Sequence, residues 1–335
     1  MKFVRGHWLV LNKSVYLVLC TLLFAFCLPV QAQQSTPVPK IGFLGVRPDD
    51  SKATFELLKR ELGTLGYIDG KNIVFEYRNA ENKPERLPGL VNDLIREKVN
   101  VLVVAATNEA RAAKNATKTI PIVGLNVGGS IEAGLIDSLR SPGGNLTGFW
   151  PDPGELRGKR LEILKETIPK VSRIAVLWDP NAPAGETAWK EIQQFATELQ
   201  LQTYSMKVSQ ADKLESALKA AVKAGSNALT VNLSAMINSH QRQIHQLAAK
   251  NRVPAIYARG EFVQSGGLMS YGADRNEGFK RAAAMIDKVL KGTKAADIPV
   301  EQPTKFELMI NLKTAKQIGL TIPPNVLARA DKVIK

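Results

Sequence analysis

Polar and aromatic side chains that could bind a small molecule stand at the ends of the short apolar runs of this sequence. Ligands bind beyond the carboxyl ends of the strands in open parallel sheets, so residues that follow a predicted strand are candidates for a binding site. The candidates are Asp50, Ser51, Thr107, Asn108, Asn126, Ser130, Trp150, Trp178, Asp179, Asn181, Tyr257, Glu261 and Tyr271. A carboxylate such as that of Asp179 binds an ammonium group, whereas hydroxyl and amide side chains bind a carboxylate. Aromatic rings such as those of Trp150 and Trp178 stack on another ring or on a cation.

Each candidate also has a purely structural interpretation. Asp50 and Ser51 are favourable residues at the start of a helix, and the sequence Asp179-Pro180-Asn181 is typical of a turn. Trp178 and Tyr257 are large apolar residues that a core readily accepts. We therefore expect several of the candidates, but not every one, to contact a ligand.

The motifs of common enzymes and cofactor sites are missing from the sequence. It contains no G-x-S-x-G hydrolase elbow, no H-E-x-x-H zinc motif and no G-x-G-x-x-G after the first apolar run. His240 and His245 lie on one predicted helix at a spacing that turns them to different faces, which does not suit a shared metal ion. We therefore expect a binding protein without a cofactor or metal. The alternative from another class is an exported two-domain α/β enzyme with scattered catalytic residues.

Segments typical of strands and of helices alternate along the chain. Residues 40–44 and 101–105 are short apolar runs, as expected for parallel strands that are buried on both faces. Residues 52–65 carry apolar side chains at helical spacing. The same pattern predicts a short helix at residues 131–139 and a single helix over residues 239–250. Alternation of this kind predicts an α/β fold with parallel sheets that are covered by helices on both faces.

The alternation runs twice along the chain. A stretch rich in Pro and Gly at residues 141–153 interrupts it, after which it starts again. The elements that follow residue 268 are too few for a third domain, so the chain is expected to return to the first domain near Tyr271 and to re-enter the second near Pro303. The predicted fold is two doubly wound parallel-sheet lobes joined by a hinge, and hinged domains close around ligands. Lobe 1 consists of residues 40–148 and 271–300, and lobe 2 of residues 149–270 and 301–335.

The N-terminal residues are typical of a secretory signal peptide. Lys2, Arg5 and Lys13 precede an apolar run at residues 15–30, and small residues lead up to a cleavage site after Ala32. The expected signal peptide is therefore residues 1–32, and the expected location is the periplasm. An uncleaved membrane anchor is the alternative, but the run is short for a span of about 20 residues.

Composition and charge limit the class of protein further. With 44% hydrophobic and 23% charged residues, the chain has the balance of an ordinary folded protein. Its net charge of +14 is typical of proteins that bind nucleic acid. An exported protein seldom meets nucleic acid, so we expect a solvated basic surface and no such partner. Cys20 and Cys27 both lie in the predicted signal peptide, so the exported chain would need no disulfide.

Several distinctive stretches occur along the chain, at residues 65–78 (LGYIDGKNIVFEYR), 119–123 (TIPIV), 141–148 (SPGGNLTG), 267–272 (GLMSYG), 299–308 (PVEQPTKFEL), 311–315 (NLKTA) and 319–324 (GLTIPP). In these stretches the chain resembles a known family, the periplasmic substrate-binding proteins of ABC transporters in their tryptophan/tyrosine-type branch. The stretches cover nearly all of the chain beyond the predicted signal peptide. One departure is visible, because the family usually has Gly-Asp-Pro where this chain has Gly128-Gly129-Ser130.

The resemblance implies a type I periplasmic-binding fold with two lobes and a central cleft. It implies a solute receptor that binds an amino acid or an aromatic acid-like molecule and delivers it to an ABC transporter permease in the inner membrane. A monomer is expected. A ligand sensor for a membrane signalling protein has the same fold and is a further alternative.

Overall fold

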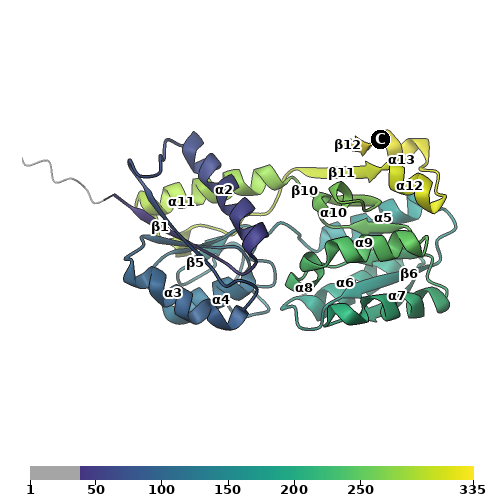
Figure 1. Cartoon of the computed structure of the whole chain (residues 1–335), viewed down its shortest axis with the longest axis horizontal. Coiled ribbons are helices and arrows are strands. Elements are labelled where there is room, and N and C mark those ends of the chain that lie inside the picture. Colours follow the sequence, from purple (N-terminus) through teal and green to yellow (C-terminus); the bar gives the residue numbers. More distant parts are fainter. Residues whose placement is uncertain (1–37) are drawn as a thin grey trace, which may run out of the picture. The chain divides into compact units, whose positions relative to one another are not determined.

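Two β-sheets organise the residues that the structure describes, in a computed structural model of the chain (Figure 1). The described part is residues 38–335, without the side chains of Asp49, Asp50 and Arg275. The predicted signal peptide at residues 1–32, with both cysteines, lies outside it. Between residues 38 and 335 no helix combines the length and the apolar character needed to cross a bilayer.

The first lobe is built on a five-stranded, fully parallel sheet in the order β2-β1-β3-β4-β5. Its strands are β1 (Lys40–Gly45), β2 (Val74–Asn79), β3 (Val101–Val104), β4 (Ile122–Gly124) and β5 (Leu146–Gly148). Its helices are α2 (Pro48–Thr64), the 3₁₀ turn η1 (Pro84–Arg86), α3 (Leu87–Arg96), α4 (Thr107–Ala116), α11 (Arg275–Leu290) and the 3₁₀ turn η3 (Ala295–Asp297). Apolar side chains of α2 and α11 pack on one face of the sheet and those of α3 and α4 on the other, so both faces are buried.

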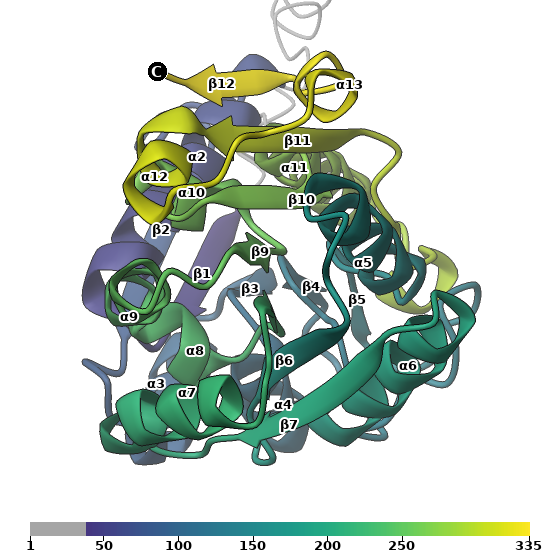
Figure 2. The ribbon, with the colours of Figure 1, turned by 90° about the vertical axis from the view of Figure 1, so that its right-hand side faces the viewer.

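The second lobe is built on a seven-stranded sheet in the order β12-β11-β10-β9-β8-β6-β7. Neighbouring strands are parallel except for β10 and β11, which are antiparallel to each other. Its strands are β6 (Arg173–Trp178), β7 (Gln202–Lys207), β8 (Ala228–Val231), β9 (Ala255–Tyr257), β10 (Met269–Ala273), β11 (Phe306–Asn311) and β12 (Lys332–Ile334). Its helices are α5 (Glu155–Thr167), α6 (Gly185–Glu198), η2 (Ala211–Lys213), α7 (Leu214–Lys223), α8 (Ala235–Ser239), α9 (Gln241–Lys250), α10 (Gly260–Gln264), α12 (Leu312–Ile318) and α13 (Pro324–Leu327). Helices α5 and α6 cover one face of this sheet and α7 and α9 the other (Figure 2).

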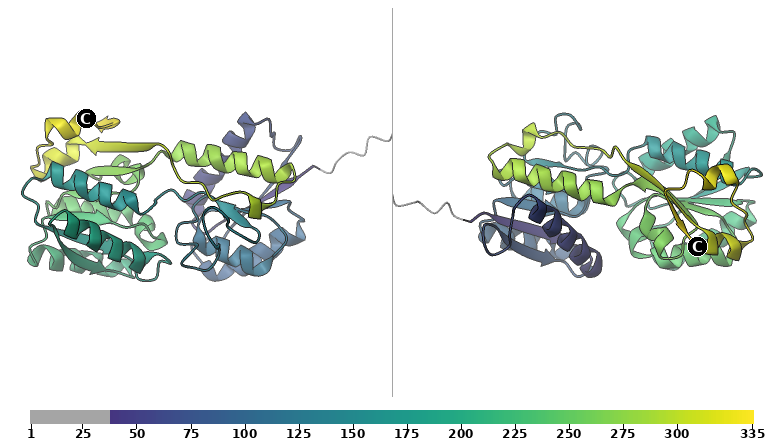
Figure 3. Two further views of the ribbon diagram at one scale, coloured as in Figure 1. Left: turned by 180° about the vertical axis from the view of Figure 1, so that it is seen from behind. Right: turned by 90° about the horizontal axis from the view of Figure 1, so that it is seen from above.

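The chain passes between the lobes at residues 149–154, at Asp274 and at residues 299–305. Figure 3 shows α11, in yellow-green, beside the N-terminal elements although it follows β10 of the second lobe in sequence. The first and last crossing segments are hydrogen-bonded to each other, because Trp150 N donates to Glu301 O at 2.9 Å and Glu301 N donates to Gly148 O at 3.0 Å. The lobes are thus joined by segments that support one another.

A carboxylate on α11 ties the last crossing segment to the first lobe. Glu277 accepts hydrogen bonds from Thr304 N at 3.2 Å and Lys305 N at 2.9 Å, and it pairs with Arg281 at 2.7 Å. Arg281 also pairs with Glu301 at 2.6 Å. Burial by itself would raise the pKa of Glu277, but these hydrogen bonds and the one from the Thr304 hydroxyl outweigh it and lower the pKa to about 2.

The helix expected at residues 131–139 was wrong, and the structure has a series of turns there. Gly134 adopts a φ of +65°, in the left-handed region, so a helix cannot continue through it. Asp137 N donates to Pro142 O at 3.0 Å and closes the turn. Leu135 and Ile136 are nevertheless buried. The helix-like apolar pattern comes from the four-residue spacing of Ile131, Leu135 and Leu139.

Two helix boundaries also differ from the prediction. The helix expected over residues 239–250 is divided at His240, whose φ of −111° ends α8 before α9 begins. Helix α2 begins earlier than expected, at Pro48, because proline suits the first turn of a helix. Ser51 therefore lies within the helix and not at its cap.

Strand β11, which returns to the second lobe near the end of the chain, should be required for stability. Ile310 is fully buried in the core of the second lobe, so we expect Ile310→Ala to lower the free energy of unfolding by about 2–5 kcal/mol. The matched control is Ile68→Ala, because the Ile68 side chain is exposed. Urea denaturation measures both, and equal stability of the two variants would contradict the role of β11.

Glu277 should make the crossing sensitive to acid. Its folded-state pKa of about 2 lies below the ordinary value of 4.5, so its stabilising contribution is present above pH 4.5 and is lost as the pH falls toward 2. We expect Glu277→Gln to have a lower free energy of unfolding than wild type at pH 7. This difference in free energy should become smaller below pH 4.5. Denaturation curves over this pH range test it, and a difference that does not depend on pH would contradict it.

Candidate functional site

A cleft with a volume of about 660 Å³ lies between the two lobes and is lined by residues of both. The first lobe contributes residues that follow β1, β3 and β4, and the second lobe contributes residues that follow β6, β8 and β9. The first crossing segment, residues 149–154, contributes Phe149, Trp150, Pro151 and Asp152. The carboxyl ends of parallel strands meet at one edge of each sheet, and these two edges face each other across the cleft.

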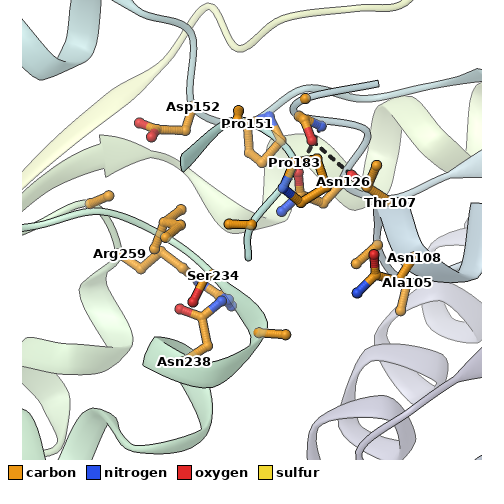
Figure 4. Close-up of a pocket in the computed structure, with 18 of the residues that line it drawn as sticks. Ala105, Thr107, Asn108, Asn126, Pro151, Asp152, Pro183, Ser234, Asn238 and Arg259 are labelled. Atoms are coloured by element: carbon orange, nitrogen blue, oxygen red, sulfur yellow. Dashed lines mark hydrogen bonds between the residues drawn. The ribbon is translucent and has the colours of Figure 1, made fainter. Parts of the chain in front are cut away.

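On the first-lobe wall, the loop after β4 is tied to the start of α4. Thr107 Oγ1 donates to Gly128 O at 2.7 Å, and Gly128 N donates to Asn126 Oδ1 at 3.1 Å (Figure 4). A Cβ atom on Gly128 would lie 3.1 Å from Trp150 Nε1, so the indole packs closely over this loop. The α4 cap residue, Ala106, has no side chain that bonds the first N–H groups of the helix.

Next to this loop lies a buried acid, Glu109, in the first turn of α4. Burial raises the pKa of its carboxyl, while the backbone N–H groups of Glu109 and Val46 and the charge of Arg47 partly offset that effect. Arg47 also reaches the second lobe, where its Nη1 donates to Ser239 Oγ at 3.1 Å. The two walls are therefore in direct contact at this side of the cleft.

On the second-lobe wall, several polar side chains shape their own loops. Asp179 is buried, and its Oδ1 accepts from Asn181 N at 2.9 Å, which forms a turn. Ser234 caps α8 by accepting from Ile237 N at 3.1 Å. Arg259 pairs with Glu261 at 3.0 Å. Figure 4 shows Ser234, Asn238 and Arg259 together on this wall.

The crossing segment supplies a buried ion pair at the floor of the cleft. Asp152 accepts from Arg160 Nη1 at 2.8 Å, and Arg160 also donates to Tyr271 O at 3.2 Å. Arg160 is 1% exposed. The neighbouring Arg157 lines the cleft and pairs with Glu191 at 2.8 Å.

The structure brings many of the predicted site residues together. Those in the cleft lining are Ser51, Thr107, Asn108, Asn126, Trp150, Asp179, Asn181 and Glu261. Those outside the lining are Ser130, Trp178, Tyr257 and Tyr271. Asp50 lies in the first turn of α2, and its side chain is outside the described part of the structure.

The residues outside the lining are packed in the second lobe or under a loop. Trp178 stacks on Trp189 with ring centroids 6.1 Å apart, and its Nε1 donates to Ser205 Oγ. Tyr257 is fully buried against Phe262, and this burial raises the pKa of its hydroxyl. Both are the last residues of their strands, so their side chains still alternate onto a sheet face and do not pass beyond its edge.

The remaining two also pack away from the cleft. Tyr271 lies within β10 and packs against Phe306, and Ser130 is buried in the turns that follow β4. The cleft lining holds other residues that were not singled out as candidates. They are Arg47, Glu109, Asp152, Arg157, Asn232, Ser234, Asn238, Arg259, Asp274 and Phe279. Five of them follow strands and fit the same rule, namely Arg47, Asn232, Ser234, Arg259 and Asp274. The other five carry no such signal.

Comparison with known proteins adds the family to this geometry. A family model described as ABC transporter substrate binding protein matches residues 46–334. The chain belongs to this family. This confirms the family that the sequence stretches indicated.

A curated relative and two solved structures are similar to the chain. The tyrosine-binding protein of Clostridioides difficile strain R20291 is 29% identical over 280 residues, which are 84% of this chain and 80% of the relative. A conserved domain protein from Vibrio cholerae has a TM-score of 0.82 and 27% identity, with 88% of this chain and 99% of that one covered. An ABC domain from Streptococcus pneumoniae, solved in complex with L-Trp, has a TM-score of 0.81 and 26% identity with the same coverage. These similarities confirm the predicted α/β fold of the family of substrate-binding proteins.

The buried pair at the floor of the cleft should dominate the local energetics. Asp152→Ala leaves the Arg160 guanidinium buried without its carboxylate, so we expect a loss of about 3–5 kcal/mol in the free energy of unfolding. The matched control is Asp212→Ala, which removes an exposed pair with Lys213 and should cost about 0–1 kcal/mol. Denaturant titration measures both. The double variant Asp152→Ala/Arg160→Met should be less destabilised than Asp152→Ala, and the opposite order would contradict the assignment.

Proposed function

We propose that this chain is a periplasmic solute receptor that binds one amino acid or aromatic acid-like molecule in the cleft and delivers it to an ABC permease of the inner membrane. The observation that carries the proposal is a cleft built from the strand ends of both lobes in a chain of this family. The tyrosine-binding relative and the L-Trp complex support an amino acid as the ligand. We propose that the exported chain acts as a monomer and binds without catalysis.

The polar groups of the cleft suit the two charges of an amino acid. At the start of α4 the cap residue Ala106 offers no side-chain acceptor to the N–H groups of Thr107 and Asn108. Both residues line the cleft, so these two N–H groups can bind a carboxylate together with the Asn108 amide. The Thr107 hydroxyl already donates to Gly128 O, so its proton is used within the protein. On the opposite wall the Asp179 carboxylate can pair with an ammonium group, because only its Oδ1 is used in the turn to Asn181.

Aromatic residues of the cleft provide an apolar surface for a side chain. Phe149, Trp150 and Phe279 line the cleft and can pack against a ring. We propose that the lobes, residues 40–148 with 271–300 and residues 149–270 with 301–335, close around the ligand by bending at the crossing segments. Closure of this kind requires contacts that form only when both walls meet the ligand.

A screen of the standard amino acids by thermal shift, followed by calorimetric titration, tests the proposal. A ligand that binds only the folded chain raises the Tm. We expect one site per chain with a Kd on the order of micromolar, which corresponds to a binding free energy of about −8 kcal/mol. Absence of any amino acid that raises the Tm, or turnover of a bound molecule, would contradict the proposal.

Asp179→Asn tests the ammonium contact within the same titration. The asparagine keeps an oxygen for the turn to Asn181 and removes only the charge. We expect the variant to bind the amino acid about 2–5 kcal/mol more weakly, because the ammonium loses its buried partner. Asp212→Asn, on the exposed surface, is the control and should bind as wild type does. Equal affinity of the two variants would remove Asp179 from the site.

A further inference from the structure

Some buried polar atoms of the second-lobe wall have no hydrogen-bond partner within the described structure. The atoms of this kind between residues 38 and 335 are Ser130 Oγ, Arg157 Nε, Ser226 Oγ, Asn232 Nδ2, Asn238 Oδ1 and His245 Nε2. Of these residues, Arg157, Asn232 and Asn238 line the cleft, and all three belong to the second lobe. A buried polar group that lacks a partner costs free energy, so a set of them in a cleft wall points to a ligand that supplies the partners.

The two asparagines are held firmly by their surroundings. Asn232 follows β8 directly, its backbone N donates to Leu177 O at 2.9 Å, and the residue is 7% exposed. Asn238 lies on α8, where its N donates to Ser234 O at 2.9 Å. The adjacent Ile237 is fully buried and anchors this helix in the core. Neither amide is therefore a loose surface group, and Figure 4 shows Asn238 at the cleft.

The chemistry of the two atoms is complementary. The amide nitrogen of Asn232 is a donor and the amide oxygen of Asn238 is an acceptor. A carboxylate only accepts and an ammonium only donates, whereas a hydroxyl or a primary amide does both. Arg157 differs from these two asparagines because it is charged, and its charge is already balanced by Glu191.

We propose that Asn232 and Asn238 select the side chain of the ligand, by donating to and accepting from a neutral hydroxyl or primary amide group at its end. This inference rests on the proposed binding of an amino acid. The charges of the amino acid have other partners in the cleft, at Asp179 and at the start of α4. The second-lobe amides therefore distinguish ligands that are equal in charge but differ in one polar group.

Matched pairs of amino acids test the selection by calorimetric titration. The pairs are L-tyrosine with L-phenylalanine, L-threonine with L-valine, and L-glutamine with L-methionine. We expect the polar member of at least one pair to bind about 100-fold more tightly, because an apolar analogue would leave both buried amides unpaired. In Asn232→Leu and in Asn238→Leu this preference should fall to less than about tenfold, through weaker binding of the polar member.

The stability of the unliganded variants separates a ligand contact from a structural role. Leucine replaces an amide whose buried atom has no partner, so we expect the Tm of Asn232→Leu and Asn238→Leu to stay the same or rise. The control is Asn145→Leu, because Asn145 Nδ2 donates to Thr117 O at 3.0 Å and Ile120 O at 2.8 Å. Its Tm should fall.

The possible outcomes are distinct. If amino acids bind but no pair shows a preference, or if both asparagine variants weaken the two members of a pair equally, the inference is overturned and the proposed function stands. If the variants lose Tm as Asn145→Leu does, the two amides have a structural role and the inference is overturned. If no amino acid binds the wild-type chain, the proposed function fails and the inference fails with it.

Discussion

The buried ion pair between Asp152 and Arg160 fixes the first crossing segment to α5 of the second lobe. Asp152 belongs to the first crossing segment, Arg160 to α5, and the same guanidinium donates to Tyr271 O just before the chain crosses again at Asp274. A charge that is 1% exposed must keep its partners, because leaving it unpaired in the core is costly. The third crossing segment is bound to the first by two backbone hydrogen bonds of Glu301, whose O accepts from Trp150 N and whose N donates to Gly148 O. The crossings thus form one connected support at the floor of the cleft.

Given that support, the position of the cleft follows from the direction of the strands. Both sheets are parallel where they face each other, so the strand ends of one lobe are opposite those of the other. The walls keep polar atoms without partners, such as Asn232 Nδ2 and Asn238 Oδ1, at positions where an apolar residue would be more favourable for folding. Loss of stability at such positions is typical of residues that are retained for binding.

The sequence predicts much of this structure, and the failures have physical reasons. Strands β1 and β3 lie within one residue of the expected residues 40–44 and 101–105, because short apolar runs mark them clearly. The turns at residues 131–139 were mistaken for a helix because their apolar residues have helical spacing while Gly134 stops the helix.

For the site, the rule that ligands bind beyond the strand ends correctly predicts Thr107, Asn126 and Asp179 as residues of the cleft lining. The rule does not distinguish a residue that lies beyond the end of its strand from one that is still in the strand and points onto a face of the sheet. Trp178 and Tyr257 are of the second kind. Asn238 and Arg157 lie on helices, and Phe279 lies on a helix that joins the first lobe from far along the chain, so only the tertiary structure brings them to the cleft.

The central claim is that the lobes close on a ligand, and small-angle scattering tests it most directly. In the structure, Gly129 of the first lobe has a φ of +78°, and a Cβ atom there would lie 3.1 Å from Ala184 Cβ of the second lobe. If the lobes close, the wild-type chain should show a smaller radius of gyration at a saturating concentration of its amino acid than without it. In Gly129→Ala the decrease should be reduced, while Gly134→Ala, which has a similar φ but open space around it, should contract as wild type does. A ligand that binds tightly and leaves the radius of gyration of wild type unchanged would contradict the account.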